Sequence, residues 1–175
     1  AGQRRRTIYT LGPLIHNKQV IETLKEKNIL AVKSAAEIKE KGAILVIRAH
    51  GIPPEEEARI RALDLEVVDA TCPLVKHVQK NIAEHAAKGY STIIVGDADH
   101  AEVLGLMGYT QGRGYVVSGP EEIKNLPPLE KANIVAQTTQ EPEVFAAAAA
   151  AARERVTELT VSDTVCNPTK QRQTE

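Results

Sequence analysis

Short runs of aliphatic and β-branched residues alternate with helical patterns along this chain, and this alternation constrains the fold more than any other feature. The strand-like runs lie at residues 7–10, 43–49, 66–70, 92–96, 115–117, 133–136 and 159–165. The helical patterns lie at residues 18–27, 55–63, 73–88 and 102–108, and three more begin near Pro120, Pro142 and Asn167. Strands rich in Val and Ile that alternate with helices predict an α/β fold with parallel sheets buried on both faces.

Composition excludes several classes of function. The chain carries 22 basic and 23 acidic residues, so no excess of positive charge favours nucleic acid as a partner. The longest uncharged apolar run, residues 144–152, is far shorter than the ~20 residues that a membrane-spanning helix needs. The two cysteines, Cys72 and Cys166, are too few and too far apart for a disulfide framework. We therefore expect a reducing compartment, the cytoplasm, and no membrane or nucleic-acid partner.

Polar residues of reactive types follow the predicted strands one after another. They are His16, His50, Cys72, His100, Thr138, Thr139 and Cys166. In open parallel α/β sheets, ligands bind outside the carboxyl ends of the strands. The pattern therefore predicts that these side chains gather at one edge of the sheets, where a cavity could form.

The two cysteines have two interpretations at this point. Cys72 directly precedes a predicted helix, whose N-terminus favours a thiolate, but a small buried core cysteine fits the same context about equally well. Cys166 lies at an equivalent strand-to-helix turn, which favours a role as metal ligand for both. Two thiolates alone do not complete an iron–sulfur cluster, which normally needs three or four.

The histidines and one glutamate are also ambiguous. His16 and His50 suit either a phosphate ligand or a neighbouring backbone group. His100 and Glu102, two residues apart at a predicted helix start, could deliver protons or simply cap the helix. Three histidines and a glutamate could also bind zinc, but their spacing matches no local zinc motif.

Seven stretches taken together resemble the 4-hydroxy-3-methylbut-2-enyl diphosphate reductases, the LytB or IspH family. They are GPLIHN (12–17), AHG (49–51), DATCPLV (69–75), HAEV (100–103), MG (107–108), QTT (137–139) and DTVC (163–166), followed by Arg172 and Gln173. No single stretch is decisive. The ordered set is specific, and it covers nearly the whole chain.

This resemblance implies a trefoil of small parallel-sheet βα domains around a [4Fe–4S] cluster, with about two domains present here. The implied boundaries are residues 1–71 for the first α/β domain, 72–165 for the second, and 166–175 for the start of a third. Cys72 and Cys166 match two of the three cysteine ligands of the cluster. The third ligand, in a Gly- and Val-containing motif, falls outside this chain.

The resemblance also implies roles for the other residues. His16, His50 and His100 match residues that bind the substrate diphosphate. Glu102 matches the acid that supplies protons, and Thr138 matches a substrate-binding hydroxyl that orients the leaving oxygen. The implied reaction is the two-electron reductive dehydroxylation of 4-hydroxy-3-methylbut-2-enyl diphosphate to isopentenyl and dimethylallyl diphosphate, the last step of the methylerythritol phosphate route. The implied electron donor is ferredoxin or flavodoxin.

Departures from the family pattern set further expectations. Asp97 stands where many relatives carry His, and Ala101 stands where Pro is usual. With one cysteine motif and most of the third domain outside the chain, we expect these residues alone to be unable to hold a stable cluster or turn over.

Two other functions remain open from the residues. One is a non-catalytic α/β phosphate-binding module, which would need the histidines but not the cysteines. The other is a thiol-dependent enzyme with one activated cysteine and no iron.

Overall fold

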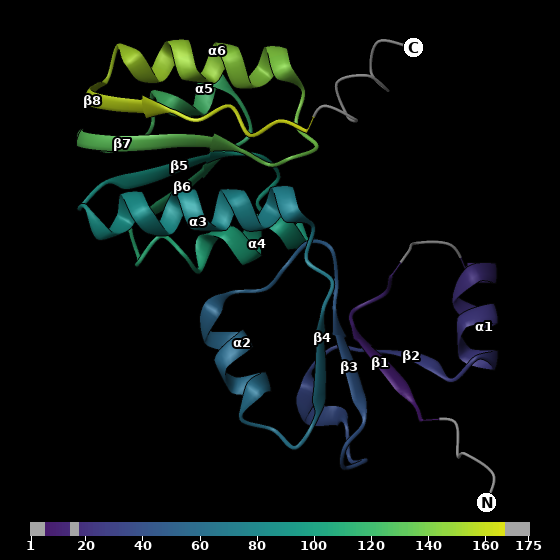
Figure 1. The fold of residues 1–175 in the computed structure, drawn as a ribbon. Helices are drawn as coiled ribbons and strands as arrows, with labels where there is room; N and C mark the ends of the chain where they lie inside the picture. The colour runs from purple at the N-terminus through teal and green to yellow at the C-terminus, as the bar shows by residue number, and fades with distance from the viewer. Residues whose placement is uncertain (1–5, 15–17, 167–175) are drawn as a thin grey trace, which may run out of the picture. The chain divides into compact units, whose positions relative to one another are not determined.

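The computed structural model describes residues 6–14 and 18–166, which form two parallel β-sheets with their helices (Figure 1). The chain divides into two compact units, residues 1–71 and 72–175. The first unit contains β1 (Ile8–Leu11), α1 (Lys18–Glu26), β2 (Ile29–Val32), the short 3₁₀ helix η1 (Ala35–Glu37), β3 (Ile44–Ile47), α2 (Pro54–Arg61) and β4 (Glu66–Asp69). The second contains α3 (Pro73–Ala87), β5 (Ser91–Val95), α4 (Ala101–Met107), β6 (Gly114–Val117), α5 (Pro120–Ile123), β7 (Leu129–Ala136), α6 (Pro142–Arg153) and β8 (Val156–Val161).

The two sheets have the same strand order. The first sheet runs β2-β1-β3-β4 and the second runs β6-β5-β7-β8, with every neighbouring pair parallel. In each sheet the first strand of the chain, β1 or β5, is an inner strand. The second strand, β2 or β6, pairs with it at one edge, and the third and fourth strands then add to its other side. The predicted α/β class with parallel βα units is confirmed. The third unit expected from residue 166 onward lies, apart from Cys166, outside the described residues.

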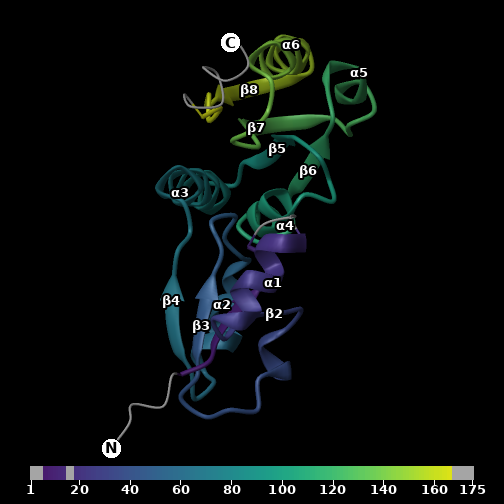
Figure 2. The ribbon, with the colours of Figure 1, turned by 90° about the vertical axis from the view of Figure 1, so that its right-hand side faces the viewer.

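Helices cover both faces of the second sheet, as Figures 1 and 2 show. Ile93 and Val95 of β5 face a core that includes α5 and α6, whereas Ile94 faces a core formed with α3 and α4. All three side chains are fully buried, as the period of two along a strand requires. Burial on both faces explains why the inner strands read as continuous apolar runs.

The alanine run at residues 146–152 is a packed helix, as predicted. It belongs to α6, in which Phe145, Ala148, Ala149 and Ala152 are buried against the sheet. Alanine favours helix, and its small side chain lets the helix backbone approach the strands closely.

A triangle of hydrogen-bonded polar side chains, one of them fully buried and two half-buried, joins α3, β7 and the segment after β8. Asn133 of β7 is completely buried; its Nδ2 donates to Asn81 Oδ1 of α3 at 2.7 Å. Ser162, just after β8, donates its hydroxyl to Asn133 Oδ1 at 3.0 Å and accepts from Asn81 Nδ2 at 3.2 Å. The three residues satisfy one another, as buried polar groups must.

Three strands differ from the sequence-based expectation by more than two residues. The edge strand β2 was not predicted. β7 begins at Leu129, where the pattern predicted a strand over residues 133–136, and β8 spans Val156–Val161, where it predicted residues 159–165. After β8, residues 162–166 continue in an irregular conformation alongside the end of β7. Cys166 therefore lies several residues beyond its strand. In the described residues, no helix is long and apolar enough to cross a membrane.

Candidate active site

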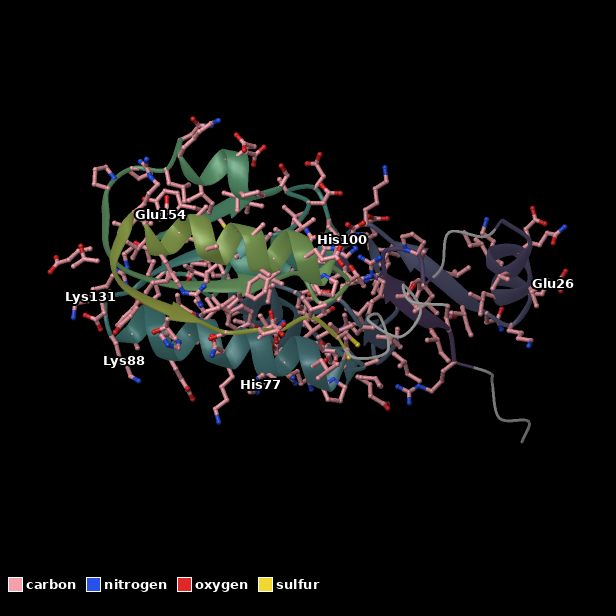
Figure 3. The ribbon with its side chains drawn as sticks, turned by 90° about the horizontal axis from the view of Figure 1, so that it is seen from above. Glu26, His77, Lys88, His100, Lys131 and Glu154 are labelled. Atoms are coloured by element: carbon pink, nitrogen blue, oxygen red, sulfur yellow. The ribbon has the colours of Figure 1, made fainter. Side chains whose placement is uncertain are left out.

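The carboxyl ends of β5 and β7 create the first part of the site. The chain leaves β5 toward one side of the sheet and leaves β7 toward the other, so the two following loops diverge at a topological switch point, where ligands bind in folds of this kind. The loop after β5 contains Gly96, Asp97 and His100, and the loop after β7 contains Gln137 and Thr138. Figure 3 shows His100 at the opposite end of the unit from Lys88 and Glu154.

Gln137 joins these two loops. Its Oε1 accepts from the Asp97 backbone N–H at 3.1 Å, and its Nε2 donates to Thr139 Oγ1 at 2.7 Å. Its side chain packs against Gly96, where a Cβ atom would lie 2.9 Å from both Gln137 Cβ and Oε1 and 3.0 Å from Val103 Cγ2. Any side chain at residue 96 would therefore displace Gln137 and disturb its hydrogen bonds to the two loops.

We expect Gly96→Ala to destabilise the protein by about 1–3 kcal/mol, because the added methyl group overpacks the contact with Gln137 and Val103. Gly119→Ala is the matched control: a Cβ there would lie 3.8 Å from its nearest neighbour, Val144 Cγ1. The measurement is the free energy of unfolding of both variants. Equal losses in the two would contradict the steric argument.

His100 caps α4. It occupies the N-cap position, and its Nδ1 accepts from the Glu102 backbone N–H at 3.2 Å. Because Nδ1 is an acceptor, a neutral imidazole in this position carries its proton on Nε2. His100 is therefore a helix cap that can also present an N–H donor.

Glu102 and Thr138 are paired inside the unit. Thr138 donates its backbone N–H to Glu102 Oε1 at 2.7 Å and its hydroxyl to Glu102 Oε2 at 2.8 Å. Glu102 is 2% exposed and Thr138 is 7% exposed. Among the described residues no salt bridge includes Glu102, and the two hydrogen bonds from Thr138 fix both of its carboxyl oxygens. A carboxyl group fixed in this way is a candidate for proton transfer.

Cys166 is tied directly to this pair. Its backbone N–H donates to the Thr138 carbonyl oxygen at 2.8 Å. Just before it, the hydroxyl of Thr164 both accepts from the Ala136 N–H and donates to the Ala136 carbonyl, each at 2.8 Å. The irregular segment after β8 is thus anchored along the end of β7, which brings a half-buried cysteine beside Thr138.

Cys72 occupies the N-cap of the 15-residue helix α3, with Pro73 at the first helical position. Its carbonyl oxygen accepts the first helical hydrogen bond, from Lys76 N, at 3.0 Å. The preceding turn is fixed because Thr71 donates both its N–H and its hydroxyl to Asp69 Oδ1, at 2.9 and 2.5 Å. The N-terminus of a long helix carries partial positive charge, so it stabilises the anionic thiolate form of a cysteine at this position.

In the first unit the equivalent loops follow β1 and β3, which form the same switch point. Arg48, directly after β3, donates Nη1 to the Pro13 carbonyl oxygen at 3.0 Å and packs against Gly12. Burial lowers the pKa of the Arg48 guanidinium. His50 is half-buried in the loop after β3, whereas His16 lies outside the described residues.

The described candidate residues follow corresponding strands of the two units. His50 and Thr138 follow the third strand of their units, Cys72 and Cys166 follow the fourth, and His100 follows the first. In the sequence, His16 stands after the first strand of its own unit. In the described residues, no group of three or more His, Cys, Asp and Glu side chains is arranged to hold a metal ion.

Comparison with known proteins decides the family. The model of the LytB protein family matches residues 1–175. This chain belongs to the LytB family. The resemblance seen in its motifs is confirmed.

Named relatives support the same family assignment. The 4-hydroxy-3-methylbut-2-enyl diphosphate reductase of Opitutus terrae is 44% identical over 184 residues, which cover 100% of this chain and 64% of that protein. The protein of the same name from Aquifex aeolicus is 41% identical over 95% of this chain and 58% of its own length. This LytB-family chain therefore spans about three fifths of the curated relatives it matches.

Solved structures share its fold. A structure of (E)-4-hydroxy-3-methyl-but-2-enyl diphosphate reductase, described as the terminal enzyme of the non-mevalonate pathway, superimposes with a TM-score of 0.85 and 40% identity, covering 97% of this chain and 60% of that one. The reductase structure from Plasmodium falciparum also gives 0.85, at 27% identity and 54% coverage of that chain.

Sequence reasoning missed two residues that shape this LytB-family site. Gln137 was noticed only as part of the QTT stretch, although a polar residue directly after a buried strand signals a position at the switch point. Thr164 likewise entered only as part of the DTVC stretch. Its bond to the β7 backbone is a non-local contact with no signature in the local pattern.

Proposed function

We propose that this chain supplies catalytic residues of a 4-hydroxy-3-methylbut-2-enyl diphosphate reductase. In that reaction the allylic C–O bond breaks and the hydroxyl group leaves as water. Two electrons and two protons are consumed, and isopentenyl and dimethylallyl diphosphate are formed. The observation that carries the proposal is the buried Glu102–Thr138 pair bonded through the backbone to Cys166, which joins a proton-carrying group to a thiol ligand.

Glu102 is proposed to deliver protons, and Thr138 to orient the leaving oxygen. Thr138 is suited to this because its hydroxyl can bond the substrate oxygen while its backbone N–H still holds Glu102. His100 is proposed to bind the diphosphate through Nε2, since Nδ1 is occupied by the helix cap. His16 and His50 are proposed to bind the same diphosphate from the corresponding loops of the first unit.

Cys72 and Cys166 are proposed to hold a [4Fe–4S] cluster, with the third thiolate from outside this chain. Both are free and half-buried, a state compatible with thiolate ligands. When bound, the cluster would supply electrons and a Lewis-acidic iron. With two of three ligands, we propose that these 175 residues alone neither retain the cluster nor turn over.

Ferredoxin or flavodoxin is the proposed electron donor, and the cytoplasm is the proposed compartment. The two alternatives are weaker. A phosphate-binding module has no need for a buried acid held against a threonine beside a cysteine. A thiol enzyme needs a base beside its cysteine, and no hydrogen bond to either cysteine sulfur is found among the described residues.

The test uses the chain extended at both ends to its natural length. It is reconstituted anaerobically with iron and sulfide, its iron is counted, and turnover of the diphosphate is measured with reduced methyl viologen. About four irons per chain and formation of both products are expected. A fully extended protein that binds no iron would overturn the proposal and leave the two alternatives.

A further inference from the structure

Three aspartates stand three residues before a candidate site residue. The chain contains five aspartates, and three of them share this spacing: Asp69 before Cys72, Asp97 before His100, and Asp163 before Cys166. Each of the three lies at the carboxyl end of a strand, β4, β5 or β8, or two residues beyond it. The spacing therefore connects residues of reactive types with one kind of strand ending.

All three aspartates make the same turn. In each case Oδ1 of the carboxylate accepts the backbone N–H two residues further on: from Thr71 at 2.9 Å, from Asp99 at 3.0 Å, and from Val165 at 3.1 Å. This is an Asx turn, in which the side chain takes the place of a backbone carbonyl and fixes the intervening peptide. The aspartate therefore sets the direction in which the chain leads to the next residue, the cysteine or histidine.

The turn before His100 is bonded on both sides. The Asp97 carbonyl oxygen accepts the His100 N–H at 3.0 Å, and the N–H of Asp97 donates to Gln137 Oε1 at 3.1 Å. His100 then caps α4 through Nδ1. Asp97 thus connects the loop after β7 with the imidazole whose Nε2 is proposed to bind the diphosphate.

The turn before Cys166 is followed at once by a second anchor. Val165, whose N–H is bonded to Asp163, is buried at 6% exposure. The next N–H, that of Cys166 itself, donates to the Thr138 carbonyl oxygen at 2.8 Å. Two successive N–H groups are therefore held, which fixes the backbone that presents the thiol.

The turn before Cys72 carries an additional bond. Besides its N–H, the buried Thr71 donates its hydroxyl to Asp69 Oδ1, at 2.5 Å. Asp69 is the last residue of β4, so the turn begins directly at the strand end. One carboxylate oxygen with two donors thus fixes the peptide that leads to this cysteine.

Strands that lead to no candidate residue end in other ways. After β6, Ser118 donates its N–H to Glu122 Oε2 of α5 at 2.8 Å. After β2, the side chain of Ser34 caps η1. Thr138, after β7, is held by Glu102 instead of by a turn of its own. The three Asx turns described above all lie at strand ends that lead to a cysteine or to His100.

We propose that these three aspartates are positioning residues, each of which orients the side chain three residues further on. Asp97 acts on the imidazole of His100, and Asp69 and Asp163 act on the two proposed cluster ligands. None of the three touches substrate or iron itself. The inference rests on the proposed function, which gives the histidine and the cysteines their roles. Loss of one aspartate should therefore impair the role of the residue that it orients and leave the other role intact.

The test uses the full-length, reconstituted protein with Asp97→Ala, Asp97→Asn and Asp97→Ser, and with the same three changes at Asp69 and at Asp163. Alanine removes the acceptor. Asparagine keeps Oδ1 and removes the charge, so it separates the turn from any other interaction of the carboxylate, and serine makes such a turn more weakly. Glu122→Ala is the matched control, because it removes a carboxylate that accepts a backbone N–H after a strand and leads to no candidate residue.

Two quantities are measured: KM for the diphosphate in turnover with reduced methyl viologen, and the half-life of bound iron in excess chelator without turnover. Asp97→Ala is expected to raise KM about three- to tenfold and to leave the iron half-life within about twofold. Asp69→Ala and Asp163→Ala should shorten the iron half-life about three- to tenfold and leave KM within about twofold. Each asparagine variant should stay within about twofold of the parent, with the serine variant between asparagine and alanine.

Alanine variants that change neither quantity more than Glu122→Ala does would overturn the positioning proposal. Asparagine variants as impaired as the alanine variants would overturn it too, because the turn would then not be the cause. Equal changes of both quantities at all three positions would show a general loosening of the fold and would also overturn it. Where an alanine variant does not fold, the serine variant is compared in its place. A parent protein with neither iron nor turnover would instead overturn the proposed function.

Discussion

Replacing Glu102 with Gln is expected to lower the turnover of the full-length enzyme by about 10²–10⁴-fold while the iron content stays unchanged. The amide has nearly the same shape as the carboxylate, and the hydroxyl of Thr138 can rotate to accept from it, so the buried pair should persist. What the substitution removes is the exchangeable carboxyl proton. Turnover with reduced methyl viologen, iron per chain and the visible absorption spectrum are the measurements.

The control for this prediction is Glu143→Gln. Glu143 also lies in the first turn of a helix, α6, but its side chain is exposed. The same chemical change there should leave turnover within about twofold, since surface substitutions away from special features have small effects. If Glu102→Gln kept more than half of the parent activity, Glu102 would not be the proton donor.

Replacing Cys166 with Ser is expected to remove most of the iron from the reconstituted full-length protein, from about four irons per chain to below one. The bond from residue 166 to the Thr138 carbonyl is made by the backbone, so serine keeps it and the segment should remain in place. The loss would therefore report on the thiolate itself. Iron content, visible absorbance and turnover are measured together.

Cys72→Ser should behave in the same way, because both thiolates are proposed to hold one cluster. Thr157 is exposed in β8, and Thr157→Ser is the control. The protein with this substitution should keep its full iron content. Comparing Cys72→Ser with Cys166→Ser also separates the two alternative functions. A thiol enzyme would lose activity at only one of the two cysteines, and a phosphate-binding module would be insensitive to both.

The fold was largely predictable because its inner strands and long helices have strong local patterns. The positions of α3 and α6 follow from Pro73 and Pro142, each of which occupies a first helical turn. The edge strand β2 was missed because its four residues, ILAV, directly follow a helix and have no turn signature of their own apart from Asn28, whose φ of 60° marks the bend. The end of β8 was misplaced because Thr164 and Val165, which are β-branched like typical strand residues, follow it after two polar residues, and Val165 is buried outside the strand.

The candidate site was predictable in its location but not in its contacts. Strand ends placed His100, Thr138 and Cys166 at one edge, since carboxyl ends of parallel strands meet there. The two hydrogen bonds between Glu102 and Thr138 join residues that are distant in the sequence, and they depend on how the loops after β5 and β7 are placed. No local pattern encodes that geometry.

The hydrogen bonds from Glu102 through Thr138 to Cys166 form one continuous chain, and thermodynamic linkage gives it a consequence. Whatever free energy couples the two ends of this chain acts equally in both directions. A substrate that binds more tightly when iron is present at Cys166 must, by the same factor, tighten the hold on that iron. Prolonged occupancy by substrate would then protect the metal centre from loss, and a depleted substrate pool would leave it more exposed to dissociation.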